Sequence, residues 1–266
     1  MTALRDKPNV LNIPAGHSFA DSLARGLLER TQGDPLALGD YLLLLPSRRA
    51  CRTLQGAFLR LSGGQAIVLP RLLPVGDVEA EEVALLLSGL DGDAPAADIP
   101  EAVSKLERQI LLARALLQSG KAQSFDQGVS LAQDLGHFLD EVQTENLSFD
   151  ALGRLVPESF AGHWQQTLKF LETLTDIWPQ ILQSRGLIDS AARRGLLLAA
   201  QEKLWRRHPP AYPVIAAGST GTVPAARSLL ALVARLPQGE LVLPGLDTQM
   251  DDDSWERIGE DHPQYN

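Results

Sequence analysis

Two short stretches contain residue types that could bind phosphate. The first is the turn that follows the apolar run 10–13 and precedes a helical pattern: Ala15, Gly16, His17, Ser18, Phe19 and Ala20. Nucleotide-binding folds cradle phosphates at such a strand–turn–helix junction, using glycines for close backbone approach and a Lys-Ser/Thr pair for phosphate oxygens and magnesium. Only a glycine is present here. The turn therefore predicts an ordinary strand-to-helix connection or a phosphate loop without its catalytic groups, in which His17 is a surface residue or an anion contact.

The second stretch is an arginine cluster, Ser47, Arg48, Arg49 and Arg52, which follows the continuous apolar run 41–45. It lies where ligands bind in open α/β sheets, beyond the carboxyl end of a buried strand. Guanidinium forks and helix N-terminal amides suit phosphate oxygens. Because the helix dipole disfavours arginine at an N-terminus, helix stability does not explain the cluster. We therefore favour contacts to a nucleic-acid backbone over a merely solvated helix face.

A glycine-bounded turn, Gly218, Ser219, Thr220 and Gly221, separates a later apolar run from a helical pattern. Successive backbone amides in such a turn could form an anion-binding nest, and a plain glycine turn explains the sequence equally well. The residues do not form a Gly-x-Ser-x-Gly motif, and no histidine stands in a triad-like context. We expect no catalytic residue here.

The run 140–143, Asp-Glu-Val-Gln, is similar to an acidic helicase motif that holds magnesium and water. That motif must follow a buried strand, whereas this run follows apolar residues at helical spacing: Leu131, Leu135, Phe138 and Leu139. We interpret it as the polar end of a helix. His137 and His163 have no partner at ligand spacing, so we expect no metal site.

The pattern of apolar runs predicts an α/β fold with an all-α insertion. Strands are expected at 10–13, 41–45 and 66–69, with helices from 19 and over 47–60 between them, which implies a parallel sheet with right-handed crossovers. A short acidic helix over 79–87 and a loop over 91–100 follow. Residues 101–205 show no strand pattern, and helices are expected at 101–119, 126–145, 148–155, 158–184 with a kink at Pro179, and 189–207. Strands return at 213–217 and 241–243 around a helix at 224–236. The predicted divisions are 1–95, 96–210 and 211–266.

Composition limits the function classes. The net charge is −9, but residues 41–76 contain no acid and five arginines, so a local basic face on an acidic protein is expected. The lone Cys51 excludes an intrachain disulfide and a cysteine-rich metal or iron–sulfur site. Neither a signal-peptide core nor a run of about 18 apolar residues is present, so we expect a cytoplasmic chain with no membrane contact. The abrupt end at 262–266 leads us to expect an N-terminal fragment.

Taken together, several runs resemble the N-terminal part of the AddB subunit family of AddAB helicase–nucleases, in its alphaproteobacterial form. These complexes process double-strand DNA breaks. The resemblance extends nearly end to end and rests on the order and spacing of the runs at 44–52, 140–145, 163–168, 214–221, and 243–247 with 262–265.

The resemblance implies a degenerate superfamily 1 helicase domain: a RecA-like sheet with a helical insertion. In active relatives the first turn reads roughly Ala-Gly-Ser-Gly-Lys-Thr, and here Phe19 falls at the lysine and Ala20 at the threonine. The Ser47-Arg48-Arg49 turn falls where such helicases contact single-stranded DNA. Ala216-Ala217 replace acids expected near the later turn. The resemblance thus places the expected ligand contacts at the turn after the next strand over, at Ser47, and not at the first turn.

The resemblance also implies partners and cofactors. An AddA-type subunit would supply ATP hydrolysis, and the iron–sulfur cluster and magnesium of the family belong to a nuclease domain beyond residue 266, so no cofactor is expected within this chain. The expected function is a non-motor scaffold for double-strand break repair that contacts DNA and the partner subunit. Two alternatives stay open: an ATP-binding helicase domain with an atypical phosphate loop, and a purely structural piece of a subunit.

Overall fold

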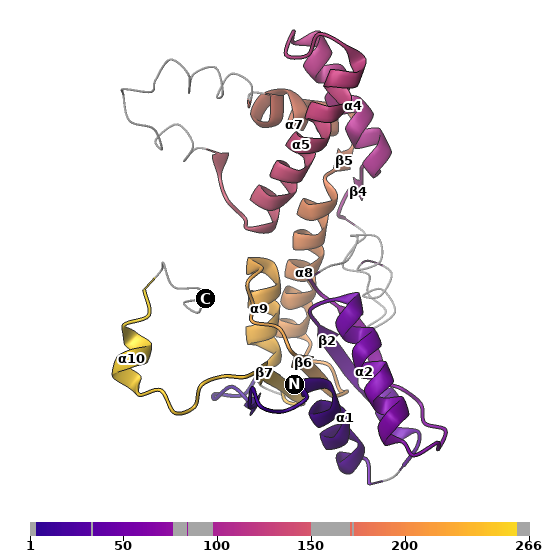
Figure 1. The fold of residues 1–266 in the computed structure, drawn as a ribbon, viewed down its shortest axis with the longest axis vertical. Coiled ribbons are helices and arrows are strands. Elements are labelled where there is room, and N and C mark those ends of the chain that lie inside the picture. Colours follow the sequence, from indigo (N-terminus) through magenta and orange to yellow (C-terminus); the bar gives the residue numbers. More distant parts are fainter. Residues whose placement is uncertain are drawn as a thin grey trace. The chain divides into compact units, whose positions relative to one another are not determined.

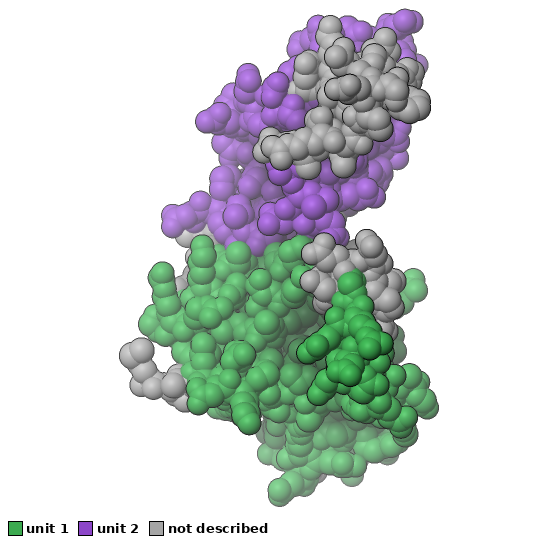
Figure 2. Space-filling model, turned by 90° about the vertical axis from the view of Figure 1, so that its left-hand side faces the viewer, with its two compact units in different colours: residues 1–78, 82–96, 198–266 green, residues 79–81, 97–197 purple. Residues whose placement is uncertain are grey.

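A computed structural model describes residues 4–32, 34–76, 84, 98–149, 171 and 173–259 of the chain. The chain divides into an α/β unit, residues 1–78, 82–96 and 198–266, and a helical unit, residues 79–81 and 97–197 (Figure 2). The helical unit ends within a helix and not at the expected residue 210, because that helix continues through the division. The expected helices at 79–87 and 148–155, and the first part of 158–184, lie outside the described residues.

The α/β unit contains a five-stranded, wholly parallel sheet (Figure 1). Its strands are β1 (Val10–Ile13), β2 (Leu42–Leu45), β3 (Arg71–Pro74), β6 (Val214–Ala217) and β7 (Gly239–Pro244). Their order is β1-β7-β6-β2-β3, which confirms the α/β class and the parallel sheet. The sequence suggested that the turns after β1 and β2 follow neighbouring strands. They do not, because β7 and β6 lie between β1 and β2 in the sheet. The β1 and β2 strands are therefore about 14 Å apart at a spacing of about 4.8 Å per strand.

Helices cover the two faces of this sheet in a way that follows from the strand connections. Helices α1 (Phe19–Arg30) and α2 (Arg48–Leu61) pack against each other and share one apolar core with alternate strand residues such as Leu43 and Leu45. Helix α9 (Pro224–Val233) packs on β6 and β7 and contributes nothing to that core, so it covers the opposite face. All four residues of β2 are buried, as expected for a strand covered on both faces.

Local capping explains where α2 begins and ends. The Ser47 Oγ accepts a hydrogen bond from the Ala50 N–H at 3.2 Å, as predicted for an N-cap. At the other end, Gly63 and Gly64 adopt φ values of +61° and +84°, which residues with a side chain rarely reach. The sequence thus predicted this helix, with its start and stop, correctly.

The strand expected at 66–69 is wrong, because β3 lies at 71–74. Ile67 and Leu69 pack on the core without strand pairing, and the backbone N–H of Val68 donates to the Pro35 carbonyl outside the sheet. Sheet pairing begins where the Arg71 N–H donates to the Tyr41 carbonyl. Pro74 is tolerated at the end of β3 because this is an edge strand, where a missing N–H breaks no ladder.

The helical unit contains two short strands that the sequence did not predict. β4 (Glu101–Ala102) and β5 (Leu187–Ile188) form a parallel pair, and two-residue strands are too short to show an alternating pattern. Its described helices are α4 (Lys105–Gln118), α5 (Phe125–Thr144), a π-helical turn (Thr173–Ile177), α7 (Trp178–Arg185) and the first part of α8 (Ser190–Arg207). The helix geometry changes at the expected kink, since the π turn ends immediately before Trp178 and Pro179.

Two short elements complete the described α/β unit: a 3-10 turn, η1 (Ala37–Asp40), before β2 and the helix α10 (Asp252–Glu256) after β7. Trp178 and Leu174 are 1% exposed in the core of the helical unit. No described helix combines the length and apolar character needed to cross a membrane.

Candidate functional site

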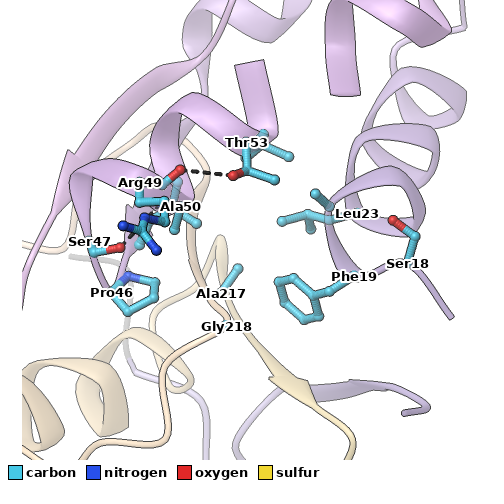
Figure 3. A pocket seen from close by; sticks show the side chains of 13 residues that line it. Ser18, Phe19, Leu23, Pro46, Ser47, Arg49, Ala50, Thr53, Ala217 and Gly218 are labelled. Carbon is cyan, nitrogen blue, oxygen red and sulfur yellow. Dashed lines mark hydrogen bonds between the residues drawn. The ribbon is translucent and has the colours of Figure 1, made fainter. Parts of the chain in front are cut away.

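A pocket of about 420 Å³ opens at the carboxyl ends of β2 and β6 (Figure 3). Apolar side chains and small residues form most of it, with a few hydroxyl groups and one guanidinium. The lining residues come from α1, α2 and the ends of the two strands: Ser18, Phe19, Ala20, Leu23, Leu45, Pro46, Ser47, Arg49, Ala50, Thr53, Leu54, Ala217 and Gly218.

The strand connections explain why a pocket lies at this point. β2 and β6 are neighbours, but β2 leads into α2 on one face of the sheet and β6 leads into α9 on the other. The segments that follow β2 and β6 diverge as they leave the sheet, and this opens a crevice beyond the carboxyl ends of the two strands. In open α/β sheets, ligands bind at this switch point. Both turns that the sequence singled out at Ser47 and Gly218 meet there.

Two helices form facing walls of the pocket (Figure 3). Phe19 and Leu23 project from α1, while Arg49 and Thr53 project from α2. The Phe19 ring packs on Gly218, where an added Cβ would lie 3.1 Å from the ring Cε1 atom and the backbone has φ +73°. A side chain at position 218 would therefore strain the backbone and press on the ring. The predicted phosphate-loop residues Phe19 and Ala20 thus reach the arginine turn through α1, although β1 and β2 are not adjacent.

The turn before α1 is stabilised by its own side chains. The His17 N–H donates to the Pro14 carbonyl at 3.1 Å, and the exposed His17 side chain does not line the pocket. The Ser18 Oγ donates to Asp21 Oδ2 at 2.9 Å, and Asp21 forms an ion pair with Arg60 of α2. These contacts, first that of Arg60 and then that of Ser18, lower the pKa of the Asp21 carboxyl. The first turn of α1 therefore carries a carboxylate whose charge Arg60 balances within the protein.

Sequence patterns of phosphate-binding groups do not single out Asp21. The spacing Ser18-x-x-Asp21 is a capping signature, which could have indicated a helix start built around a carboxylate. The ion pair with Arg60 joins α1 and α2 and had no signal in the sequence.

The predicted DNA-contacting residues all lie at the first turns of α2. Arg48, Arg49 and Arg52 are exposed, and the first turn of the helix has no acidic residue. Arg48 has an interaction within the chain, whereas the guanidinium groups of Arg49 and Arg52 make no hydrogen bond or ion pair with any residue that the structure describes. The Ser47 oxygen is occupied as a cap, and its O–H remains available to donate.

The turn 218–221 has a more limited capacity to bind an anion than its sequence suggested. The Gly218 N–H donates to the Val242 carbonyl at 3.0 Å, and the Gly221 N–H donates to Ser219 Oγ at 3.3 Å. Two of the four amides are thus occupied. A nest at this turn stays a prediction that now depends on the amides of Ser219 and Thr220.

The acidic run 140–143 belongs to a polar network within the helical unit. Asp140 lies on α5, as predicted, and its Oδ1 is 2.8 Å from Arg108 Nη1. The Arg108 Nε lies 3.0 Å from Asp189 Oδ1, close enough for an ion pair but without hydrogen-bond alignment. Asp189 Oδ2 accepts hydrogen bonds from Gln143 Nε2 and Trp178 Nε1, both at 2.9 Å. Asp189, which is 2% exposed, had no signal in the sequence.

Among the residues in the described ranges, no three His, Cys, Asp or Glu side chains are grouped so that they could hold a metal ion. Comparison of the chain with protein-family models gave no match, and comparison with curated proteins gave none.

Proposed function

We propose that this chain is a helicase-like domain without motor activity that contacts the phosphate backbone of single-stranded DNA. In this proposal it serves as a scaffold in a cytoplasmic double-strand break repair complex of the AddAB type. An AddA-type partner subunit supplies ATP hydrolysis there. The proposal assigns the DNA contacts to Ser47, Arg48, Arg49 and Arg52.

The observation that carries the proposal is the arginine cluster at the rim of the switch-point pocket. Two of its guanidinium groups, Arg49 and Arg52, have no partner among the described residues. The position of Arg49 in the first turn of α2 is electrostatically unfavourable unless an anion lies beside it. A polyanionic backbone with regularly spaced phosphates is a ligand that several such groups can contact at once.

The arrangement of the sheet supports a helicase-like domain over a dinucleotide-binding one. In the Rossmann order 3-2-1-4-5-6 the first two strands are neighbours. Here β7 and β6 separate β1 from β2, and the helical unit is inserted between β3 and β6. A helical insertion within the first sheet is what the family resemblance implies.

The turn after β1 supports the loss of motor activity. Phe19 stands at the position of the phosphate-binding lysine, and its ring packs on Gly218 and lines the pocket. An apolar ring in place of a cation opposes a bound nucleotide.

The proposal is tested by titrating fluorescent single-stranded DNA with the chain at two salt concentrations and following anisotropy. The double variant Arg48→Ala, Arg49→Ala is expected to bind more weakly and with a smaller salt dependence, because fewer counterions are released. Unchanged affinity and unchanged salt dependence would refute the backbone contact and favour the purely structural alternative.

A parallel equilibrium dialysis with ATP tests the nucleotide-binding alternative. We expect no binding. Saturable binding of ATP that is lost when Gly16 is replaced by a bulky residue would contradict the inactivated domain and support an atypical phosphate loop.

A further inference from the structure

We propose that the switch-point pocket accepts one unstacked nucleobase from the single strand that α2 contacts, with Phe19 as its stacking surface. This inference rests on the proposed function, since it needs a DNA backbone beside α2. It assigns a ligand to a pocket that the loss of nucleotide hydrolysis would otherwise leave without a role.

The size and lining of the pocket fit a flat aromatic group. Its volume of about 420 Å³ lies within the range of roughly 300–1,000 Å³ typical of small-ligand sites. Apolar walls from Leu23, Ala50 and Leu54 would contact the faces and edges of a base without requiring hydrogen bonds. A free triphosphate, by contrast, would have to place several charges against these apolar walls.

Phe19 is positioned to stack on such a group. It is partly exposed, and one edge of its ring is fixed by the contact with Gly218. The ring lines the pocket opposite Arg49 and Thr53 (Figure 3). Stacking of a base on an aromatic side chain is a recurrent device in single-strand binding, because every base has a π face.

The charges around the opening fit the phosphates on either side of an inserted base. Arg49 lines the pocket, and Arg52 lies one turn further along α2. A base that enters the pocket brings its own phosphate and that of the next nucleotide toward this cationic rim. The apolar interior and the cationic rim thus match the two chemically different parts of one nucleotide.

The polar atoms in the pocket predict little selection among bases. The Thr53 hydroxyl donates to the Arg49 carbonyl at 3.0 Å, the Ser18 hydroxyl donates to Asp21, and the Ser47 oxygen accepts from Ala50. Discrimination between bases requires donors and acceptors in a fixed pattern that reads base edges, and here those hydroxyls are already occupied in part. We therefore expect binding that depends on the presence of a base and only weakly on its identity.

The test compares an oligothymidylate of about twenty nucleotides with an oligonucleotide of the same length that is abasic at every position. The abasic strand keeps the phosphates and lacks the bases. Phe19→Ala is expected to weaken binding of the intact strand about tenfold and to leave binding of the abasic strand unchanged. Phe19→Leu, which keeps an apolar side chain without a π face, should lose most of the same factor.

A second variant and a fluorescence signal from the base itself keep the test valid even if one variant fails to fold. Ala50→Leu fills the pocket from the α2 side, leaves Phe19 in place, and should reduce binding of the intact strand alone. An oligonucleotide with a central 2-aminopurine reports stacking by fluorescence quenching on binding, which Phe19→Ala should abolish. Circular dichroism of each variant confirms that the fold is retained.

The outcomes separate this inference from the proposed function. If the arginine variants lose affinity and salt dependence while Phe19→Ala, Ala50→Leu and the abasic strand change nothing, the base pocket is refuted and the backbone contact stands. If no variant and no strand changes affinity, both fail. Equal weakening of intact and abasic strands by a folded Phe19→Ala variant also overturns the inference.

Discussion

The carboxylates of Asp189 and Asp140 pair with the same Arg108, and their different burial predicts very different effects of removing them. Asp189 has 3% of its side chain exposed, whereas Asp140 has 42%. In the variant Asp189→Ala, the Trp178 Nε1–H and the Gln143 amide lose their acceptor inside the helical unit. The perturbation therefore removes one buried charge and leaves two donors without the partner they have in the native protein.

The expected magnitude follows from these contacts. Removing one partner of a buried ion pair destabilises a protein by about 3–5 kcal/mol. Removing a half-exposed partner by Asp140→Ala costs about 0–1 kcal/mol. After the Asp140 substitution, Arg108 keeps Asp189 and its hydrogen bond to the Gly136 carbonyl. The two variants thus each remove one carboxylate partner of the same arginine, and they differ in how deeply that carboxylate is buried.

Urea unfolding followed by circular dichroism at 222 nm measures the difference. With a denaturant slope of about 2 kcal/mol per molar urea, a loss of about 4 kcal/mol lowers the midpoint of the helical unit by about 2 M. Asp140→Ala should shift it by less than about 0.5 M. Equal shifts for the two variants would refute the argument that burial decides their contributions, as would a negligible shift for Asp189→Ala.

Three further predictions concern the α/β unit. The double variant Arg49→Ala, Arg52→Ala should reduce the slope of log affinity against log salt for single-stranded DNA by about 1.4, at about 0.7 per phosphate contact. Arg30→Ala, at the opposite end of α1 about 16 Å from Phe19 along the helix, is the control and should leave the slope unchanged. Gly239→Ala should lower the urea midpoint by the equivalent of about 3 kcal/mol, because its Cβ would lie within van der Waals overlap of the Val233 carbonyl, and an unchanged midpoint would contradict this contact. Arg60 lowers the pKa of Asp21, so the stability that their pair contributes is present above the ordinary carboxyl pKa and is lost as the pH falls through the folded-state pKa. The difference in urea midpoint between wild type and Arg60→Ala should therefore disappear in acid. A difference that persists at pH 2 would exclude the pair as its cause.

Local patterns in the sequence sufficed for the elements that flank the pocket. The apolar run before Ser47 is long and continuous, Ser47 is a strong cap, and Gly63 provides a left-handed stop, so α2 could be predicted nearly to the residue. The strand expected at 66–69 failed, because an alternating pair, Ile67 and Leu69, packs on the core without any pairing strand beside it. Hydrophobic periodicity reports burial, and burial does not require a sheet partner.

The sequence by itself determined that the first turn lacks phosphate-binding groups, that an arginine cluster follows a buried strand, and that a helical region interrupts an α/β pattern. These features depend on residues close together in the chain. Only the tertiary structure decided that β7 and β6 separate β1 from β2, that α1 and α2 nevertheless lie together on one face, and that Phe19 therefore meets the arginine turn at Gly218. Strand order depends on pairing between segments some two hundred residues apart, which no local pattern encodes, and that order is what opens a pocket between the two turns.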